Sequence, residues 1–293
     1  MRVKTTFLLT SLLAAGAFQA SMGLARPKQA ESSPSAAVSE PGKVSRSVRV
    51  LDFSALAGTT TIVFRYVAQV PGAGGQAEIV PDRKILRIHA AFTNLPPASR
   101  LGAEYLTYVL WKVTPEGRLT NLGEVELLGT EGRLNTKALP GRFGLIVTAE
   151  AYLAVSQPSK TVVFEADVAP GAFPSVPLSQ TTCQLLAVPL GAEVAPASSP
   201  ATPDPAAPLV LEEARRALAT ARQAGAEDYA PDTLATAEQL LRLAQDQQAH
   251  GVKLKDVWDT GSEAVFIAED ARVLAVTRQK RAAQARTNAE PAP

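Results

Sequence analysis

YLTYVLWKVTPEGRLTNLGE, residues 105–124, is the stretch on which the fold prediction rests. It begins with residues rich in β-branched and aromatic types, passes through TPEG at 114–117, and continues as a second extended run. Two such runs around a short connection with Pro and Gly predict a β-hairpin. Alternation puts Tyr108 on the face opposite Tyr105 and Trp111. This split favours core filling over a single aromatic binding surface.

Further strand-like runs lie on both sides of this hairpin, separated by turn signals such as PGAGG at 71–75 and NLPP at 94–97. In the run 85–92, Leu86, Ile88 and Phe92 share one face and Arg87 and His89 the other, which predicts an antiparallel strand with one solvated face. The remaining runs are 48–53, 60–70, 119–128, 133–138, 143–149 and 162–168. We therefore predict an all-β, immunoglobulin-like sandwich over residues 46–168. The Cys–Trp–Cys spacing of immunoglobulin domains is absent, so the strand topology stays open.

Residues 169–208 are interpreted as a linker. Pro189, Pro196, Pro200 and Pro203 are interleaved with Ala and Ser there, and such composition predicts an extended, semi-rigid spacer. The single cysteine of the chain, Cys183, falls in this segment, where we expect a lone thiol in a flexible flank. A disulfide within the chain is excluded because there is no second cysteine.

After Pro208 the apolar period changes from that of a strand to that of a helix. Gly225 predicts a helix end, and Pro231 suits the first turn of the next helix. The apolar stripes are Leu211, Ala214, Leu218 and Ala221; Leu234, Ala237, Leu241 and Ala244; and Leu254, Val257, Ala264, Ala268, Ala271 and Ala275. They predict a separate all-α antiparallel three-helix bundle over residues 209–286, followed by a disordered tail at 287–293. Because alanine buries little area, we expect this bundle to gain stability from self-association or from a partner.

The first 25 residues have the features of a signal peptide. Arg2 and Lys4 precede an apolar run over residues 7–20, and cleavage is expected after Gly23 or Ala25. An uncleaved N-terminal anchor is the alternative interpretation. Residues 26–45 predict a disordered leader. The mature chain is therefore expected to be periplasmic or secreted. Its formal net charge of +1 gives no reason to expect a nucleic-acid partner.

Residues 214–244, ARRALATARQAGAEDYAPDTLATAEQLLRLA with the following Ala-rich helix, resemble an uncharacterised Ala-rich helical domain of bacterial envelope proteins. The loop Tyr229-Ala230-Pro231 carries most of this resemblance. It implies an exported protein that works beside OmpA-type, peptidoglycan-binding proteins. The stretch YVLWKV at 108–113 also resembles, more weakly, the extracytoplasmic sandwich of anti-sigma-factor-type proteins, which implies a regulatory role.

The sequence offers little for catalysis. His89 and His250 fall in different predicted domains, and the chain contains no Gly-x-Ser-x-Gly, HExxH or Walker pattern. We therefore predict no enzymatic activity, no cofactor and no metal. The candidate interface residues are Trp258, Tyr229 and Trp111, because large aromatic side chains often anchor contacts. Capping of the core is an equal alternative for Trp258. The basic run Arg278, Lys280, Arg281 and Arg286 is more typical of a solvated helix end than of a contact with an anionic polymer.

These features together predict an exported structural or adaptor protein of the cell envelope without catalytic activity. Its expected partners are an envelope protein or a second copy, bound through the helical domain. The alternative is a peptidoglycan- or carbohydrate-binding periplasmic protein that uses the β-sandwich. A regulatory sensor is the third interpretation.

Overall fold

The computed structural model describes residues 42–54, 56–67, 70–167, 179–194 and 208–289. Every described residue belongs to one compact unit, Val38–Pro293. The predicted signal peptide at 1–25 lies outside the described residues. So do most of the predicted leader, most of the predicted linker, and the end of the predicted tail.

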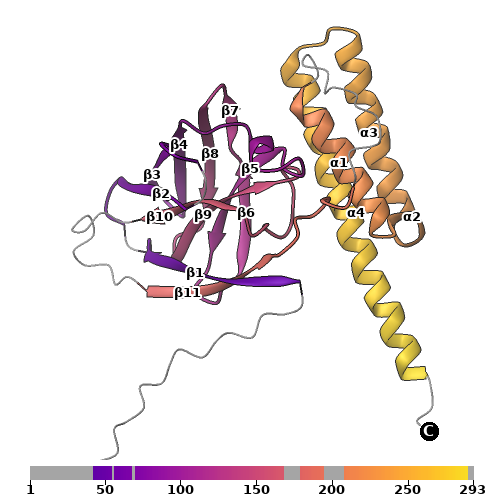
Figure 1. The fold of residues 1–293 in the computed structure, drawn as a ribbon, viewed down its shortest axis with the longest axis horizontal. Helices are drawn as coiled ribbons and strands as arrows, with labels where there is room; N and C mark the ends of the chain where they lie inside the picture. The colour runs from indigo at the N-terminus through magenta and orange to yellow at the C-terminus, as the bar shows by residue number, and fades with distance from the viewer. Residues whose placement is uncertain (1–41, 55, 68–69, 168–178, 195–207, 290–293) are drawn as a thin grey trace, which may run out of the picture. The chain divides into compact units, whose positions relative to one another are not determined.

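An antiparallel β-domain forms the first part of the described chain (Figure 1). Its eleven strands are β1 (Lys43–Asp52), β2 (Thr60–Tyr66), β3 (Gly74–Asp82), β4 (Ile85–Thr93), β5 (Thr107–Val113), β6 (Leu119–Glu124), β7 (Glu126–Leu128), β8 (Glu131–Ala138), β9 (Arg142–Glu150), β10 (Val162–Asp167) and β11 (Ser179–Leu186). A 3-10 turn, η1 (Ala98–Arg100), precedes β5. The all-β character predicted for this part is confirmed.

The strands form one hydrogen-bonded sheet in the order β11-β1-β9-β10-β2-β3-β4-β8-β7, and β5 pairs with the other edge of β9 and carries β6. The sheet nearly closes on itself, because the Thr136 hydroxyl of β8 donates a hydrogen bond to the Leu122 carbonyl of β6 at 2.7 Å. β9 therefore lies in the middle of the sheet and is paired on both edges.

The predicted hairpin is formed by β5 and β6, with Val113 paired to Leu119 across the turn. The Gly117 amide donates to the Thr114 carbonyl at 2.9 Å, and Gly117 has φ +76°. The turn contacts β11, because the Thr181 hydroxyl of that strand donates a hydrogen bond to the Pro115 carbonyl at 2.7 Å. The hairpin is confirmed, and its turn is packed against a strand far along the chain.

Replacing Gly117 by alanine is expected to lower the free energy of unfolding by about 2–3 kcal/mol. An alanine here would adopt a left-handed backbone, and its Cβ would lie 2.2 Å from the carbonyl oxygen of Thr182. Gly129→Ala is the matched control, because Gly129 has φ +65° with no heavy atom within 4 Å of the added Cβ. For the control we expect the free energy of unfolding, measured by urea unfolding, to fall by about 1 kcal/mol. Equal losses for the two variants would show that the contact with β11 does not matter.

Both faces of β5 and β9 are buried. Tyr108 and Leu110 point into the core of the β-domain, which also contains the ring contacts among Phe64, Phe92 and Phe164. Val109, Trp111 and Val113 point to the outer face and join a second apolar cluster with side chains of the helical region. Tyr105 precedes β5 and lies in the inner core with Tyr108, so the prediction that it shares a face with Trp111 is wrong.

Three predicted boundaries are also wrong. β11 runs through the predicted linker, β1 begins inside the predicted leader, and β3 begins inside the predicted loop at 71–75. β11 forms because its backbone pairs with β1 from Lys43↔Leu186 to Val50↔Ser179. Cys183 lies on β11 and is buried, not in a flexible flank.

The helical region contains α1 (Leu209–Gln223), the short α2 (Ala226–Tyr229), α3 (Pro231–Ala249) and α4 (Leu254–Ala289). Both α1 and α3 pack against α4 through their predicted stripes, and Gly225 ends α1 with φ +81°. Two expectations are corrected: Leu254 is 66% exposed, and α4 extends into the predicted disordered tail. Among the described residues, no helix has the length and apolar character that crossing a bilayer requires.

Candidate functional site

Trp111 lies between the sheet and the helical region and is fully buried, at 0% exposed. Its ring belongs to the apolar cluster that includes buried side chains of α1, α3 and α4. Its indole N–H donates to the Thr148 hydroxyl at 2.8 Å. An intermolecular contact by Trp111, as predicted, does not fit this position, because the chain's own side chains cover the ring.

The other two predicted interface residues lie in the helical region. Tyr229 ends α2, packs against the same cluster as Trp111, and accepts a hydrogen bond from Arg278 at its carbonyl. Trp258 lies on α4 and remains 39% exposed. The structure therefore places Trp111 and Tyr229 on one apolar cluster, whereas Trp258 keeps an open face. A contact between Trp258 and a partner stays a prediction.

Polar groups follow Trp111 along the outer face of the sheet. The Thr148 hydroxyl donates to Oε1 of Glu150, and the Ser159 amide donates to the same oxygen at 2.8 Å. The Glu150 side chain is buried, and its Oε2 has no hydrogen-bond partner among the described residues. Burial raises the pKa of Glu150 to about 8, although the hydrogen bonds from Thr148 and Ser159 oppose this rise.

A second, half-buried carboxyl lies on β6. Glu124 is paired in register with Val109, so both project from the same face of the sheet as Trp111. The Thr107 hydroxyl donates to Oε1 of Glu124. Burial raises the pKa of Glu124 to about 7, and the nearby Glu126 adds to the rise. The outer face thus presents two carboxyls that favour the neutral form.

The helical region contributes a third carboxyl. Glu213 of α1 is 1% exposed, and neither of its carboxyl oxygens has a hydrogen-bond partner in the described part of the chain. Burial raises its pKa well above the ordinary value, and the Glu124 carboxyl raises it further, while the Leu153 backbone opposes the rise. The charges of Glu213 of α1 and Glu124 of β6 therefore act on each other at the contact between the helical region and the sheet.

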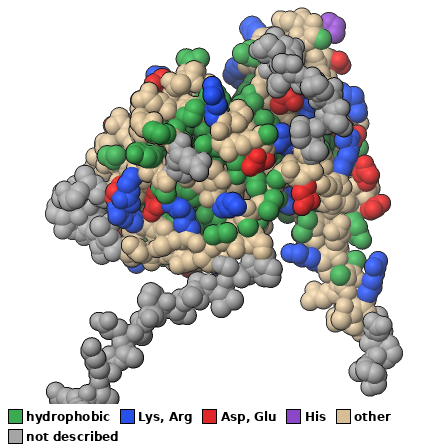
Figure 2. All heavy atoms as spheres, viewed as in Figure 1, with side chains coloured by type: hydrophobic (Ala, Val, Ile, Leu, Met, Phe, Trp, Pro, Cys, Tyr) green, Lys and Arg blue, Asp and Glu red, His purple; other side chains and the backbone are tan. Residues whose placement is uncertain are grey.

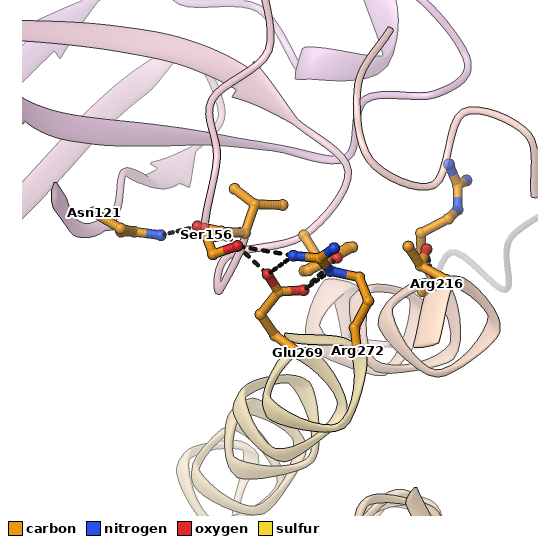
Figure 3. A network of polar contacts seen from close by, with 8 residues as sticks. Asn121, Ser156, Arg216, Glu269 and Arg272 are labelled. Atoms are coloured by element: carbon orange, nitrogen blue, oxygen red, sulfur yellow. Dashed lines mark hydrogen bonds and ion pairs between the residues drawn. The ribbon is translucent and has the colours of Figure 1, made fainter. Parts of the chain in front are cut away.

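An ion pair lies at the same contact (Figure 3). Glu269 and Arg272 of α4 are joined by two hydrogen bonds of 2.7 Å, and both side chains are buried. The Glu269 carboxylate also accepts the Tyr152 hydroxyl at 2.8 Å and the Ser156 amide at 3.0 Å. Arg272 donates to the Ser156 hydroxyl at 2.8 Å. This pair ties α4 to the segment that follows β9.

That segment is itself held on the opposite side by the sheet. Asn121 of β6 donates to the carbonyls of Leu153 and Val155 at 2.9 and 3.1 Å, and Figure 3 shows Asn121 across the loop from Glu269. The backbone of a buried loop needs such partners, because unpaired peptide groups away from water are costly. The segment 151–156 is therefore fixed between β6 and α4.

No family model, curated protein or solved structure matches the chain.

The carboxyls of Glu124, Glu150 and Glu213 at this contact can bind and release protons, because burial raises the pKa of each. In the described ranges, no group of three or more His, Cys, Asp and Glu side chains is arranged to hold a metal ion. A depression of about 300 Å³ next to α1 is lined by residues 188–193 and Arg272, but not by the three carboxyls. Burial raises the pKa of the Cys183 thiol to about 11, which disfavours the nucleophilic thiolate.

The two histidines lie away from this contact. His89 is exposed on β4, as predicted, with Nδ1 2.7 Å from Oδ1 of Asn135. His250 follows α3 and has Nδ1 2.7 Å from the Asp246 carbonyl oxygen. The structure therefore brings neither histidine together with the buried carboxyls.

Sequence reasoning did not single out Glu124, Glu150, Glu213, Glu269 or Arg272. One available signal was the stretch YVLWKV, in which Lys112 is the single charged residue, because a strand with apolar residues on both faces is buried on both faces. That signal predicts a cover over the outer face of β5. It does not say that α1 and α4 supply the cover, since those helices are far along the chain.

The end of α4 forms a different kind of surface. Ala275 is the last buried residue of this helix, and residues 283–288 are all exposed. Figure 1 shows this end of α4 continuing past α1, α2 and α3. It carries Arg278, Lys280, Arg281 and Arg286, and no acidic residue occurs over 271–289 (Figure 2). We call residues 276–289 the basic arm.

Proposed function

We propose that the protein is an exported structural or adaptor protein of the cell envelope, without catalytic activity, that binds an envelope protein through α4. The signal-peptide pattern and the resemblance of the helical region to an envelope domain support the location. We also propose that the β-domain is an immunoglobulin-like sandwich and that the helical region is an antiparallel three-helix bundle, as the sequence predicts. The β-domain and the helical region are the architecture on which it rests.

The basic arm is the observation that carries this proposal. An isolated helix of fewer than about 12–15 residues is marginal in water, because its stability comes mostly from packing. The basic arm has no buried side chain from residue 276 to residue 288, although Arg278 and Gln279 donate hydrogen bonds to the Tyr229 and Ala224 carbonyls. Beyond residue 279, its helix therefore gains little from the rest of the described chain. A partner that packs against it would supply this stability.

The charge of the arm indicates the chemistry of the partner. Its four basic residues, with no acidic residue within 276–289, favour an acidic surface and oppose side-by-side pairing of two copies. Exposed Trp258, Phe266 and Val273 lie along the same helix and add apolar contact area. The proposed partner is therefore an envelope protein with an acidic, partly apolar face.

The test is capture of envelope proteins by the full chain, compared with a Lys280→Gln, Arg281→Gln, Arg286→Gln variant. Lys84, Arg133 and Lys137 changed to Gln give the matched control, because these residues are exposed on the β-domain. We expect the arm variant to lose the captured partner and the control to retain it. Equal capture by all three proteins would contradict the proposal.

The alternative, binding of peptidoglycan or another carbohydrate by the β-domain, is checked with the same proteins. Each is sedimented with purified sacculi. Co-sedimentation that the arm variant keeps would favour the β-domain as the binding site.

A further inference from the structure

The contact between α1 and the outer face of the sheet contains a carboxyl pair without a counter-ion. Glu213 is 1% exposed with both oxygens unpartnered among the described residues, and the Glu124 carboxyl of β6 lies near enough to act on it electrostatically. If both were ionised, the two carboxylates would repel each other, and the buried Glu213 would also lose its hydration. The pair is therefore compatible with the packed helical region only while it holds a proton.

The cations near this contact are engaged elsewhere. Arg272 makes its two hydrogen bonds with Glu269, and Arg216 of α1 donates to the carbonyl of Glu104 at 3.2 Å. Neither forms an ion pair with Glu213 or Glu124 in the described part of the chain. In the described part of the chain, the other titratable groups that act on this contact are Glu126 of β7, Glu150 of β9, Tyr105 and Tyr152, and Glu212 of α1. None of them supplies a positive charge to the pair.

We propose that Glu213 and Glu124 form a proton-dependent latch between the helical region and the sheet. With a proton on the pair, α1 stays packed on the outer face of β5 and β6. When both carboxyls are ionised, the helical region separates from the sheet while each part keeps its secondary structure. This inference goes beyond the proposed function, since it concerns contacts within the chain and needs no partner.

The direction of the pH response follows from burial. The closed state favours the neutral carboxyl because burial raises the pKa of both residues, whereas in the open state water solvates the charged form. Rising pH therefore favours opening. If opening releases one proton, its equilibrium constant rises by up to about tenfold per pH unit.

Trp111 provides the readout, because opening exposes its ring. The chain contains two tryptophans, so Trp258→Phe leaves Trp111 as the only fluorescent indole. The fraction of its fluorescence that acrylamide quenches is measured in the full chain from about pH 5 to about pH 9, together with far-UV circular dichroism. We expect the quenched fraction to rise with pH and the circular dichroism to stay constant.

In the same background, Glu213→Gln and Glu124→Gln should each flatten the quenching profile, because one neutral amide removes the repulsion. Glu263→Gln is the matched control, since Glu263 is exposed on α4, and it should keep the profile of the parent. If one of the two Gln variants fails to fold, the quenching profile of the other variant tests the latch. A flat profile in the parent, an unchanged profile in the Gln variants, or loss of circular dichroism over the same range would each overturn the latch.

Discussion

Replacing Glu269 by alanine is expected to lower the free energy of unfolding by about 3–5 kcal/mol. The change takes the carboxylate away from the buried Arg272 guanidinium, which still donates to the Ser156 hydroxyl, and it removes the acceptor for Tyr152 and for the Ser156 amide. A buried cation without its carboxylate is costly because water cannot replace the lost partner. Urea unfolding of the full chain measures the loss.

An exposed ion pair on the same helix provides the control. Lys255 and Asp259 are 2.5 Å apart near the start of α4, and their side chains are 78% and 49% exposed. Asp259→Ala should cost less than about 1 kcal/mol, since water solvates an exposed charge. The double variant Glu269→Leu, Arg272→Met should recover part of the loss, because no unpaired charge remains. Equal losses for Glu269→Ala and Asp259→Ala would contradict the role assigned to the buried pair.

Glu150→Gln is expected to make the protein more stable than the parent at pH 8 by about 4 kcal/mol, and to leave its stability at pH 5 nearly unchanged. Burial raises the pKa of Glu150 to about 8 in the folded state, compared with 4.5 for an ordinary glutamate. Below pH 4.5 both states hold the proton. Between these values only the folded state keeps it, so the free energy of unfolding falls as pH rises, by up to about 1.4 kcal/mol per unit. Glutamine has no proton to lose.

Urea unfolding at several values between about pH 5 and about pH 8 checks this prediction. The stability difference between Glu150→Gln and the parent should grow steadily over this range. Glu263→Gln, at an exposed position on α4, should run parallel to the parent. Parallel profiles for Glu150→Gln and the parent would show that the Glu150 carboxyl is solvated in the folded protein.

Local signals accounted for much of the fold. The hairpin of β5 and β6 was predicted because its turn residues and strand propensities lie within twenty neighbouring positions. α1, α3 and α4 were predicted because their buried stripes have a helical period, and Gly225 and Pro231 mark their ends. In each case the residues that determine the helix or hairpin lie within that helix or hairpin.

The parts that were missed depend on distant partners. β11 has a weak strand pattern in a proline-rich neighbourhood, and it forms because β1 offers a free edge. Glu150 follows the predicted strand run 143–149 and projects from the outer face of the sheet. It is buried because the segment after β9 and the helical region lie over that face. The candidate site therefore could not be predicted from the sequence, since its carboxyls meet only after the two regions have packed.

The pairing of β1 with β11 has a consequence for the order in which the chain folds. Ser45 and Gln184, which are hydrogen-bonded between these strands, are 139 residues apart in sequence. Without β11, β1 keeps only the short ladder of Leu51 and Asp52 with β9. Contacts between such distant segments slow folding, because a long loop must close before they form. β1 therefore completes its pairing late in folding, although it precedes the other described strands in the sequence. A fragment ending at residue 168 would lack β11 and could not form the β1–β11 ladder.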